Sequence, residues 1–159
     1  MIQRVQSLYL FGAIILLVIV SFWGDFFNYI TDEAFFRFNA YGISKYTLDG
    51  KELIEQTSLP VYIATLLLAL FAAFVLFSYK KLNKQFAYSK LLWGLYLLVL
   101  IGIVAWNYFI APGQVTGKVI QNNYSHSFYL LVIGLPLTHL AHMGIRKDKK
   151  TIDSLNRLR

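Results

Sequence analysis

Long apolar segments alternate with shorter polar ones along this chain. Four segments of about 20 residues consist almost entirely of aliphatic and aromatic residues. A helix needs roughly 20 residues to cross a hydrocarbon core about 30 Å thick, because each residue adds ~1.5 Å. The pattern therefore predicts four transmembrane helices, at about residues 8–27, 59–79, 91–110 and 124–143.

The polar segment between the first two predicted spans, residues 28–58, is long for a simple connection and rich in aromatic residues. Within it, Asp49-Gly50 lies between two short β-favouring runs, which is the signal of a hairpin turn. We expect residues 111–123 to add an extended segment to this loop. The predicted fold class is therefore an all-α membrane protein. It is a four-transmembrane-helix bundle with a small outer loop cap that can include a β-hairpin.

The distribution of charge predicts the orientation of these spans. Eleven of the 15 basic residues lie in the N-terminal stub, in residues 80–90 and in the tail, residues 144–159. The other two loops hold only four basic residues, together with most of the acidic ones. By the positive-inside rule, both termini are cytoplasmic in a multi-pass protein of the bacterial inner (plasma) membrane. Because topology accounts for the net charge of +7, we expect no nucleic-acid partner.

The candidate chemistry is confined to the fourth span. His126, His139 and His142 lie there, and the last two are three residues apart, so they share a helix face. Two imidazoles at this spacing can ligate a metal, but a third ligand is needed. The second and third spans contain no His, Cys, Asp or Glu. We therefore expect no metal and no cofactor, and we treat the three histidines as a candidate intramembrane polar site.

Neither a nucleophile–base–acid arrangement nor a glycine-rich phosphate loop is visible, so we do not expect an enzyme. Small residues recur instead on two spans, with Thr65, Ala69 and Ala73 at steps of four on the second and Gly94 and Gly102 on the third. Such stripes let helices approach closely, and we expect them to serve packing within the bundle.

The tail, residues 144–159, has apolar residues near helical spacing among its basic ones. It fits two interpretations: a short amphipathic helix at the membrane surface, or a solvated segment that only sets topology. We expect the whole chain, residues 1–159, to form a single domain.

Both ends of the chain resemble one known family. Its N-terminal pattern is matched by Met1, Ile2, Gln3, Arg4, Gln6 and Ser7. Its C-terminal pattern is matched by Ile145, Lys147, Asp148, Ser154, Arg157, Leu158 and Arg159, although Asn156 replaces an acidic residue. The family is an uncharacterised four-helix inner-membrane family of Bacteroidota-type bacteria, domain of unknown function 4293. The resemblance implies a fold and a membrane but no activity.

If both termini lie on one side, the end motifs can meet in a cytoplasmic polar platform that binds a partner or lipid. The predicted platform residues are Gln3, Arg4, Gln6, Arg146, Lys147, Asp153, Arg157 and Arg159. The expected function is that of an accessory or structural subunit of a larger membrane complex, with the lipid bilayer and other membrane proteins as partners. The alternative is a small-molecule or lipid carrier that uses the fourth helix.

Overall fold

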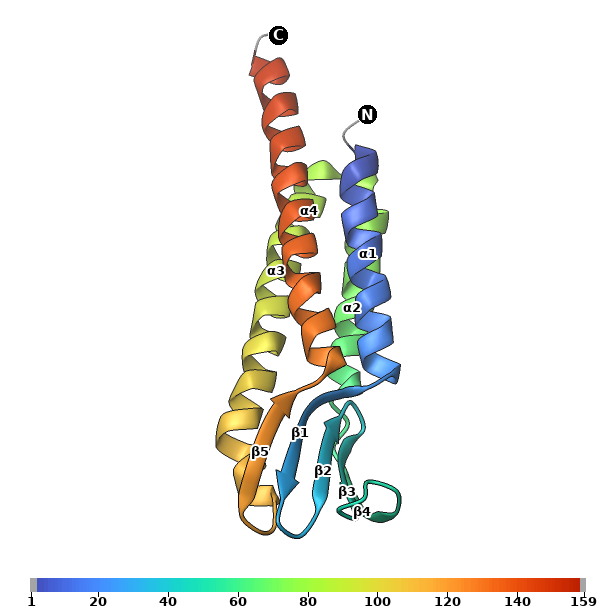
Figure 1. Cartoon of the computed structure of the whole chain (residues 1–159). Coiled ribbons are helices and arrows are strands. Elements are labelled where there is room, and N and C mark those ends of the chain that lie inside the picture. Colours follow the sequence, from blue (N-terminus) through green and yellow to red (C-terminus); the bar gives the residue numbers. More distant parts are fainter. Residues whose placement is uncertain (1–2, 158–159) are drawn as a thin grey trace.

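Four long helices run side by side as a bundle (Figure 1). The computed structural model describes residues 3–157, with side chains for residues 5–154. The helices are α1 (Gln3–Phe22), α2 (Tyr62–Phe77), α3 (Leu82–Ala105) and α4 (His126–Arg157). α1 and α3 each pack against both α2 and α4. Including the short turns that continue them, all four helices are long and apolar enough to cross a membrane.

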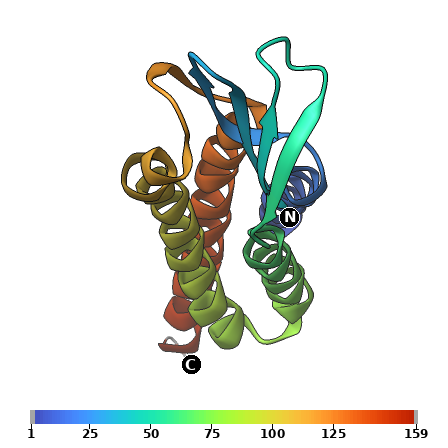
Figure 2. The same cartoon turned by 90° about the horizontal axis from the view of Figure 1, so that it is seen from below.

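A five-stranded sheet lies across one end of the bundle, away from both termini (Figures 1 and 2). Its strands are β1 (Asp25–Thr31), β2 (Phe35–Asn39), β3 (Gly42–Tyr46), β4 (Leu53–Ser58) and β5 (Val119–Tyr124). All neighbours are antiparallel, and the order across the sheet is β4-β3-β2-β1-β5. β2 is the central strand, and β1, at one side of the meander β1–β4, also pairs with β5 from the second outer segment.

The prediction of an all-α fold is wrong, because the outer segments form this sheet. The predicted hairpin is confirmed as β3–β4, and Gly50 supplies a positive φ of 67° in its turn. The expected extended segment is confirmed as β5, which pairs with β1. The missed element is β1: its first three residues, 25–27, were assigned to the end of the first span and the rest to the loop. In the structure α1 ends at Phe22, and Gly24, with φ 93°, turns the chain into the strand.

Two helices extend well beyond the predicted spans. α3 begins at Leu82, so Lys84 and Lys90, which were expected in a loop, lie in its first turns. α4 continues through the tail to Arg157 as one helix, rather than as a separate surface helix or a solvated segment. No proline follows Pro136, so nothing in the tail removes a helical hydrogen bond.

The bundle buries small residues together with large ones such as Leu17 and Tyr96, and it turns many other large apolar residues outward. Thr65 and Ala69 are buried, and the Thr65 hydroxyl lies 2.7 Å from the Ser21 hydroxyl of α1, which confirms an internal packing role for this stripe. The expectation for Gly94 and Gly102 is wrong, because both face outward and a Cβ added to either would contact nothing within 4 Å. Large exposed side chains cover the outer surface, as in a helix bundle whose solvent is lipid.

Candidate functional site: the sheet and its junction with the bundle

A buried hydrogen-bond network joins the sheet to the end of α3. There the helix continues as a π-helical turn, η2 (Trp106–Ile110), followed by a 3₁₀ turn, η3 (Ala111–Gln114). The Tyr29 hydroxyl of β1 donates to the Asn107 carbonyl oxygen at 2.7 Å and to its Oδ1 at 2.9 Å. The Asn122 Nδ2 of β5 donates to the same Oδ1 at 3.2 Å. Asn107 is fully buried, so its side chain fixes two strands to the helix end.

Aromatic packing surrounds this network. Phe27 and Phe38, on neighbouring strands, stack with ring centroids 4.6 Å apart. The Trp106 ring of η2 meets both of them edge-on, at 5.4 and 5.6 Å. Each such pair contributes about 0.5–1.5 kcal/mol beyond the area it buries. The sheet is therefore held on the bundle by a core of its own, rather than as a mobile loop.

Two phenol groups of this junction have raised pKa values. Burial is the largest cause that raises the pKa of the Tyr29 hydroxyl, and the nearby Tyr124 and Tyr108 raise it further. The pKa of the Tyr124 hydroxyl is raised chiefly by burial too, and a hydrogen bond with the Asn107 side chain opposes the shift. Both phenols therefore stay neutral at physiological pH and act as hydrogen-bonding groups.

The opposite face of the sheet points away from α3 and carries a row of polar side chains. The residues pair in register from strand to strand: Asn123 with Asn28, Asn28 with Arg37, Arg37 with Ser44, and Ser44 with Gln56. Because successive side chains of a strand alternate between faces, these five lie on the face opposite Phe27, Tyr29 and Phe38. We call them the polar row; it crosses the whole sheet.

Arg37 is the single charged member of the polar row. Its guanidinium lies 4.9 Å from the Tyr46 ring centroid and 5.3 Å from that of Phe35. Its ion pair with Asp25 is long, at 4.0 Å, and the Arg37 side chain is 41% exposed. Burial raises the pKa of Asp25, although Arg37 and His126 oppose that shift. The Arg37 charge is thus positioned by two rings and only weakly neutralised.

A cavity of about 240 Å³ opens on the bundle-facing side, between β3, β4 and η3. The Lys45 Nζ lies in it and bonds the Thr116 hydroxyl at 3.1 Å, above the Phe36 ring at 5.6 Å. Glu55 is its register partner on β4. The cavity is therefore lined by both signs of charge.

The three predicted histidines do not form one site. His142 shares a hydrogen bond of 2.9 Å with the Ser89 hydroxyl and stacks on Phe86, while the exposed His139 lies beside Trp93. His126 is the first residue of α4, at the sheet end. Among the described residues, no group of three His, Asp or Glu side chains is placed to hold a metal ion.

The predicted polar platform is brought together only in part. Gln6 is 4% exposed, and its Nε2 donates to Asp148 Oδ2 at 2.6 Å, so it clamps α1 to α4. Gly144 makes room for it, because a Cβ there would lie 2.6 Å from the Gln6 Cγ. The remaining residues divide into two groups. Arg146, Lys147 and Asp153 are exposed on α4, and the side chains of Gln3, Arg4, Arg157 and Arg159 lie outside the described residues.

The polar row and the Asn107 network were not found in the sequence. The signal for the row is the alternation of apolar and polar residues from Phe36 to Asn39, which does not identify the partner strands. Register decides which residues become neighbours across strands, and one sequence does not show it. Asn107 lay inside an otherwise apolar span, where a lone amide is a weak signal.

The fold therefore defines a class: a bundle of four apolar helices of membrane-spanning length, capped by a five-stranded antiparallel sheet. The chain belongs to the family described as Domain of unknown function (DUF4293), whose model matches residues 2–158. The resemblance seen at the two chain ends is thereby confirmed. Neither a curated protein nor a solved structure matches the chain.

Proposed function

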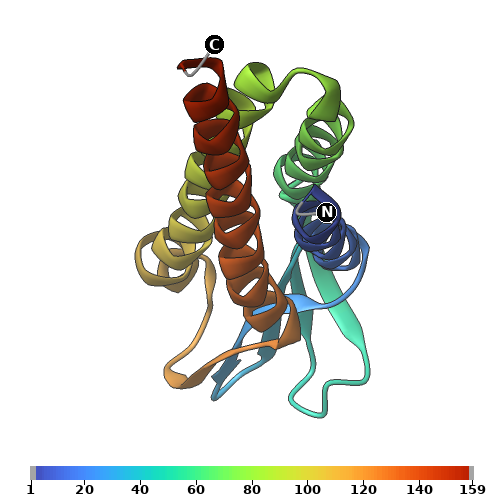
Figure 3. The ribbon, with the colours of Figure 1, turned by 90° about the horizontal axis from the view of Figure 1, so that it is seen from above.

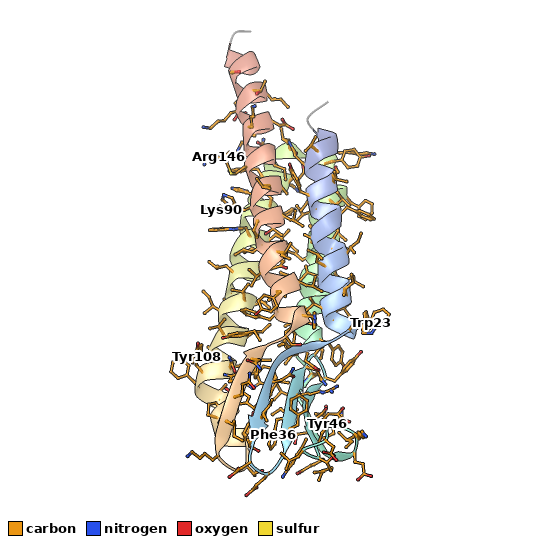
Figure 4. The ribbon with its side chains drawn as sticks, viewed as in Figure 1. Trp23, Phe36, Tyr46, Lys90, Tyr108 and Arg146 are labelled. Carbon is orange, nitrogen blue, oxygen red and sulfur yellow. The ribbon has the colours of Figure 1, made fainter. Side chains whose placement is uncertain are left out.

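We propose that this protein is an integral membrane subunit that docks a partner membrane protein through its sheet. Three features support the membrane placement. The span Val5–Phe22 has 18 residues, or about 27 Å of helix, close to the ~30 Å core of a bilayer. The exposed Trp23 and Tyr108 lie where the bundle meets the sheet, whereas Lys90 and Arg146 lie towards the other end (Figure 4).

Aromatic side chains are favoured at the membrane–water interface, and cations are favoured on the cytoplasmic side. In this placement both termini are cytoplasmic, and the sheet lies on the outer surface of the inner membrane. The outward glycines of α3 support a subunit role, since Gly94 and Gly102 leave space for close approach by another helix.

The observation that carries the docking role is the polar row. The amides of Asn28, Gln56 and Asn123 accompany a single, weakly neutralised guanidinium on a sheet fixed to the bundle, while Ser44 is buried between them. Such a surface offers many hydrogen bonds and one positive charge in a fixed geometry, which suits a segment rich in carboxylates and carbonyl oxygens. The partner is accordingly an outer segment of another membrane protein.

Adjacent residues of β4 provide a matched test. Gln56 belongs to the polar row, whereas Glu55 points to the opposite face, and both are exposed. A photo-crosslinking amino acid introduced at position 56 in living cells should capture a discrete partner, and the same amino acid at position 55 should not. Arg37→Gln should reduce the capture at position 56 several-fold. Equal capture from both positions, or capture that ignores Arg37, would refute the docking role.

A further inference from the structure

A second cavity lies at the other end of the molecule, where α2 connects to α3. The connection is a short turn, η1 (Ser78–Lys80), and the residues that follow it, 81–84, lie beside the C-terminal half of α4 (Figure 3). The cavity has a volume of about 340 Å³. We call it the lysine cavity, and its lining residues are Phe74, Phe77, Ser78, Lys80, Lys81, Lys84 and Tyr88.

The lysine cavity concentrates positive charge without a counter-charge. Three of its lining residues are lysines and none is acidic. Between Glu55 and Asp148 the chain has no acidic residue at all. Among the described side chains, none of the three lysines forms an ion pair. Three lysines around one cavity make its electrostatic potential positive, which favours a bound anion.

The rest of the lining is aromatic and continues into the membrane-spanning surface. Phe74 and Phe77 are 52% and 74% exposed, and Tyr88 packs on Phe74 with ring centroids 5.2 Å apart. Phe71 extends this surface by one turn, stacked on Phe74 at 6.2 Å. An apolar wall that descends from a group of cations matches an amphiphile, with its anionic head at the lysines and its chains along the rings.

A neighbouring cavity of about 380 Å³ lies on the far side of Lys81 and Lys84 and is a weaker candidate. It is lined by Lys149 from α4, but also by Asp153. The Asp153 carboxylate lowers the local positive potential, and no aromatic ring lines this cavity. Of these two cavities, only the lysine cavity combines positive charge with an apolar wall.

We propose that the lysine cavity binds an anionic phospholipid, with the phosphate at Lys80, Lys81 and Lys84 and the acyl chains along Phe74 and Phe77. This proposal rests on the membrane placement proposed above, but not on the docking role of the sheet. The aromatic wall favours a lipid over free phosphate, because inorganic phosphate would leave the exposed rings uncovered.

The test compares two double variants that remove the same charge from different positions, one pair in the lysine cavity and one pair outside it. The variant K81Q/K84Q removes two charges from the cavity. The control K147Q/K150Q removes two charges from exposed positions of α4 that do not line it. Each protein is purified in neutral detergent and titrated with phosphatidylglycerol or phosphatidylcholine, and bound lipid is counted by native mass spectrometry. Unchanged melting temperatures establish that all variants are folded.

We expect wild type and K147Q/K150Q to bind phosphatidylglycerol with the same affinity, and K81Q/K84Q to bind at least about ten-fold more weakly. Phosphatidylcholine should bind all three proteins equally weakly. Phe77→Ala should weaken phosphatidylglycerol binding, and millimolar inorganic phosphate should not displace the lipid. Equal losses in both lysine pairs would show that only total charge matters and would overturn the proposal.

Displacement by phosphate alone would also overturn the lipid assignment. Reconstitution of the wild type into phosphatidylcholine vesicles separates this proposal from the earlier one. Stable insertion into these vesicles, together with no preference for phosphatidylglycerol in the lipid titration, refutes lipid binding in the lysine cavity alone. Failure to insert refutes the membrane placement on which both proposals depend.

Discussion

Removal of one oxygen atom tests whether the sheet is fixed to α3 through Asn107. Tyr29→Phe deletes the hydroxyl that bonds the Asn107 carbonyl at 2.7 Å and Oδ1 at 2.9 Å, and it keeps the ring. The ring's edge contacts with Phe27 and Phe38, at 6.1 and 5.5 Å, should therefore persist. The change isolates the hydrogen bonds from the aromatic packing.

The expected cost follows from burial. Asn107 is fully buried, so water cannot replace the lost donor at its carbonyl oxygen. A buried acceptor left without its partner costs about 1–3 kcal/mol. For a chain of this size, 1 kcal/mol corresponds to roughly 2–4 °C in melting temperature, so the variant should melt about 2–12 °C lower. The control Tyr41→Phe removes a hydroxyl from a 42% exposed side chain and should change the melting temperature little.

Hydrogen exchange locates the effect. If the network fixes the sheet, Tyr29→Phe should speed amide exchange in β1 and β5 more than in α1 or α2, because local opening precedes global unfolding. A double-mutant cycle with Asn122→Ala should show coupling, since both side chains bond the same Asn107 Oδ1. An unchanged melting temperature together with unchanged exchange in the strands would refute the network as the attachment of the sheet.

The remaining predictions concern the bundle and the edge of the polar row. Gly134→Ala should lower the melting temperature, because the added Cβ would clash with the Tyr96 hydroxyl. Gly102→Ala should be neutral or stabilising by up to ~1 kcal/mol, because a Cβ there contacts nothing. Equal effects of the two substitutions would contradict the packing of α3 against α4. For Asp25, burial raises the folded-state pKa above 3.8, so its contribution to stability falls as pH rises from about 4 through the folded-state pKa. Asp25→Asn removes that fall, so the melting temperature of the variant should rise relative to that of the wild type as the pH increases over this window. A difference in melting temperature that does not change with pH would contradict a raised pKa of Asp25.

The helices, the β3–β4 hairpin and the extended segment β5 could be predicted from the sequence, whereas β1 and the pairing of the strands could not, for physical reasons. Four apolar runs of sufficient length specify four helices whatever their partners are. Phe26 and Phe27, the apolar start of β1, follow α1 closely, and hydropathy does not separate the start of a buried strand from the end of a span. The separating signal was Gly24, which ends the helix by adopting a positive φ. At the candidate site, the composition of the polar row was visible, but its register was not.

Long-range packing also gives some of the residues named in the sequence analysis a role other than the expected one. Gln6 was predicted to contribute to a binding platform because it belongs to the N-terminal motif and both termini were expected on one side. In the structure it is buried, since Gly144 lets α4 approach and Asp148 accepts its amide. No local pattern could show that residues 142 positions apart share one hydrogen bond. The fourth-helix histidines likewise lie along a helix with His126 at the far end, so sequence proximity to one another did not make a site.

α3 connects the features that the proposals use. Its first turn supplies Lys84 to the lysine cavity, and its π-helical extension holds the sheet through Asn107. Between these ends it turns Gly94 and Gly102 outward, where a Cβ would contact nothing within 4 Å. In the proposed placement, a partner helix lying on this face would reach the outer surface beside η2 and the cytoplasmic surface beside the lysine cavity. Bound lipid and bound partner would then stabilise the same helix from its two ends, so loss of the lipid should weaken docking without altering the polar row.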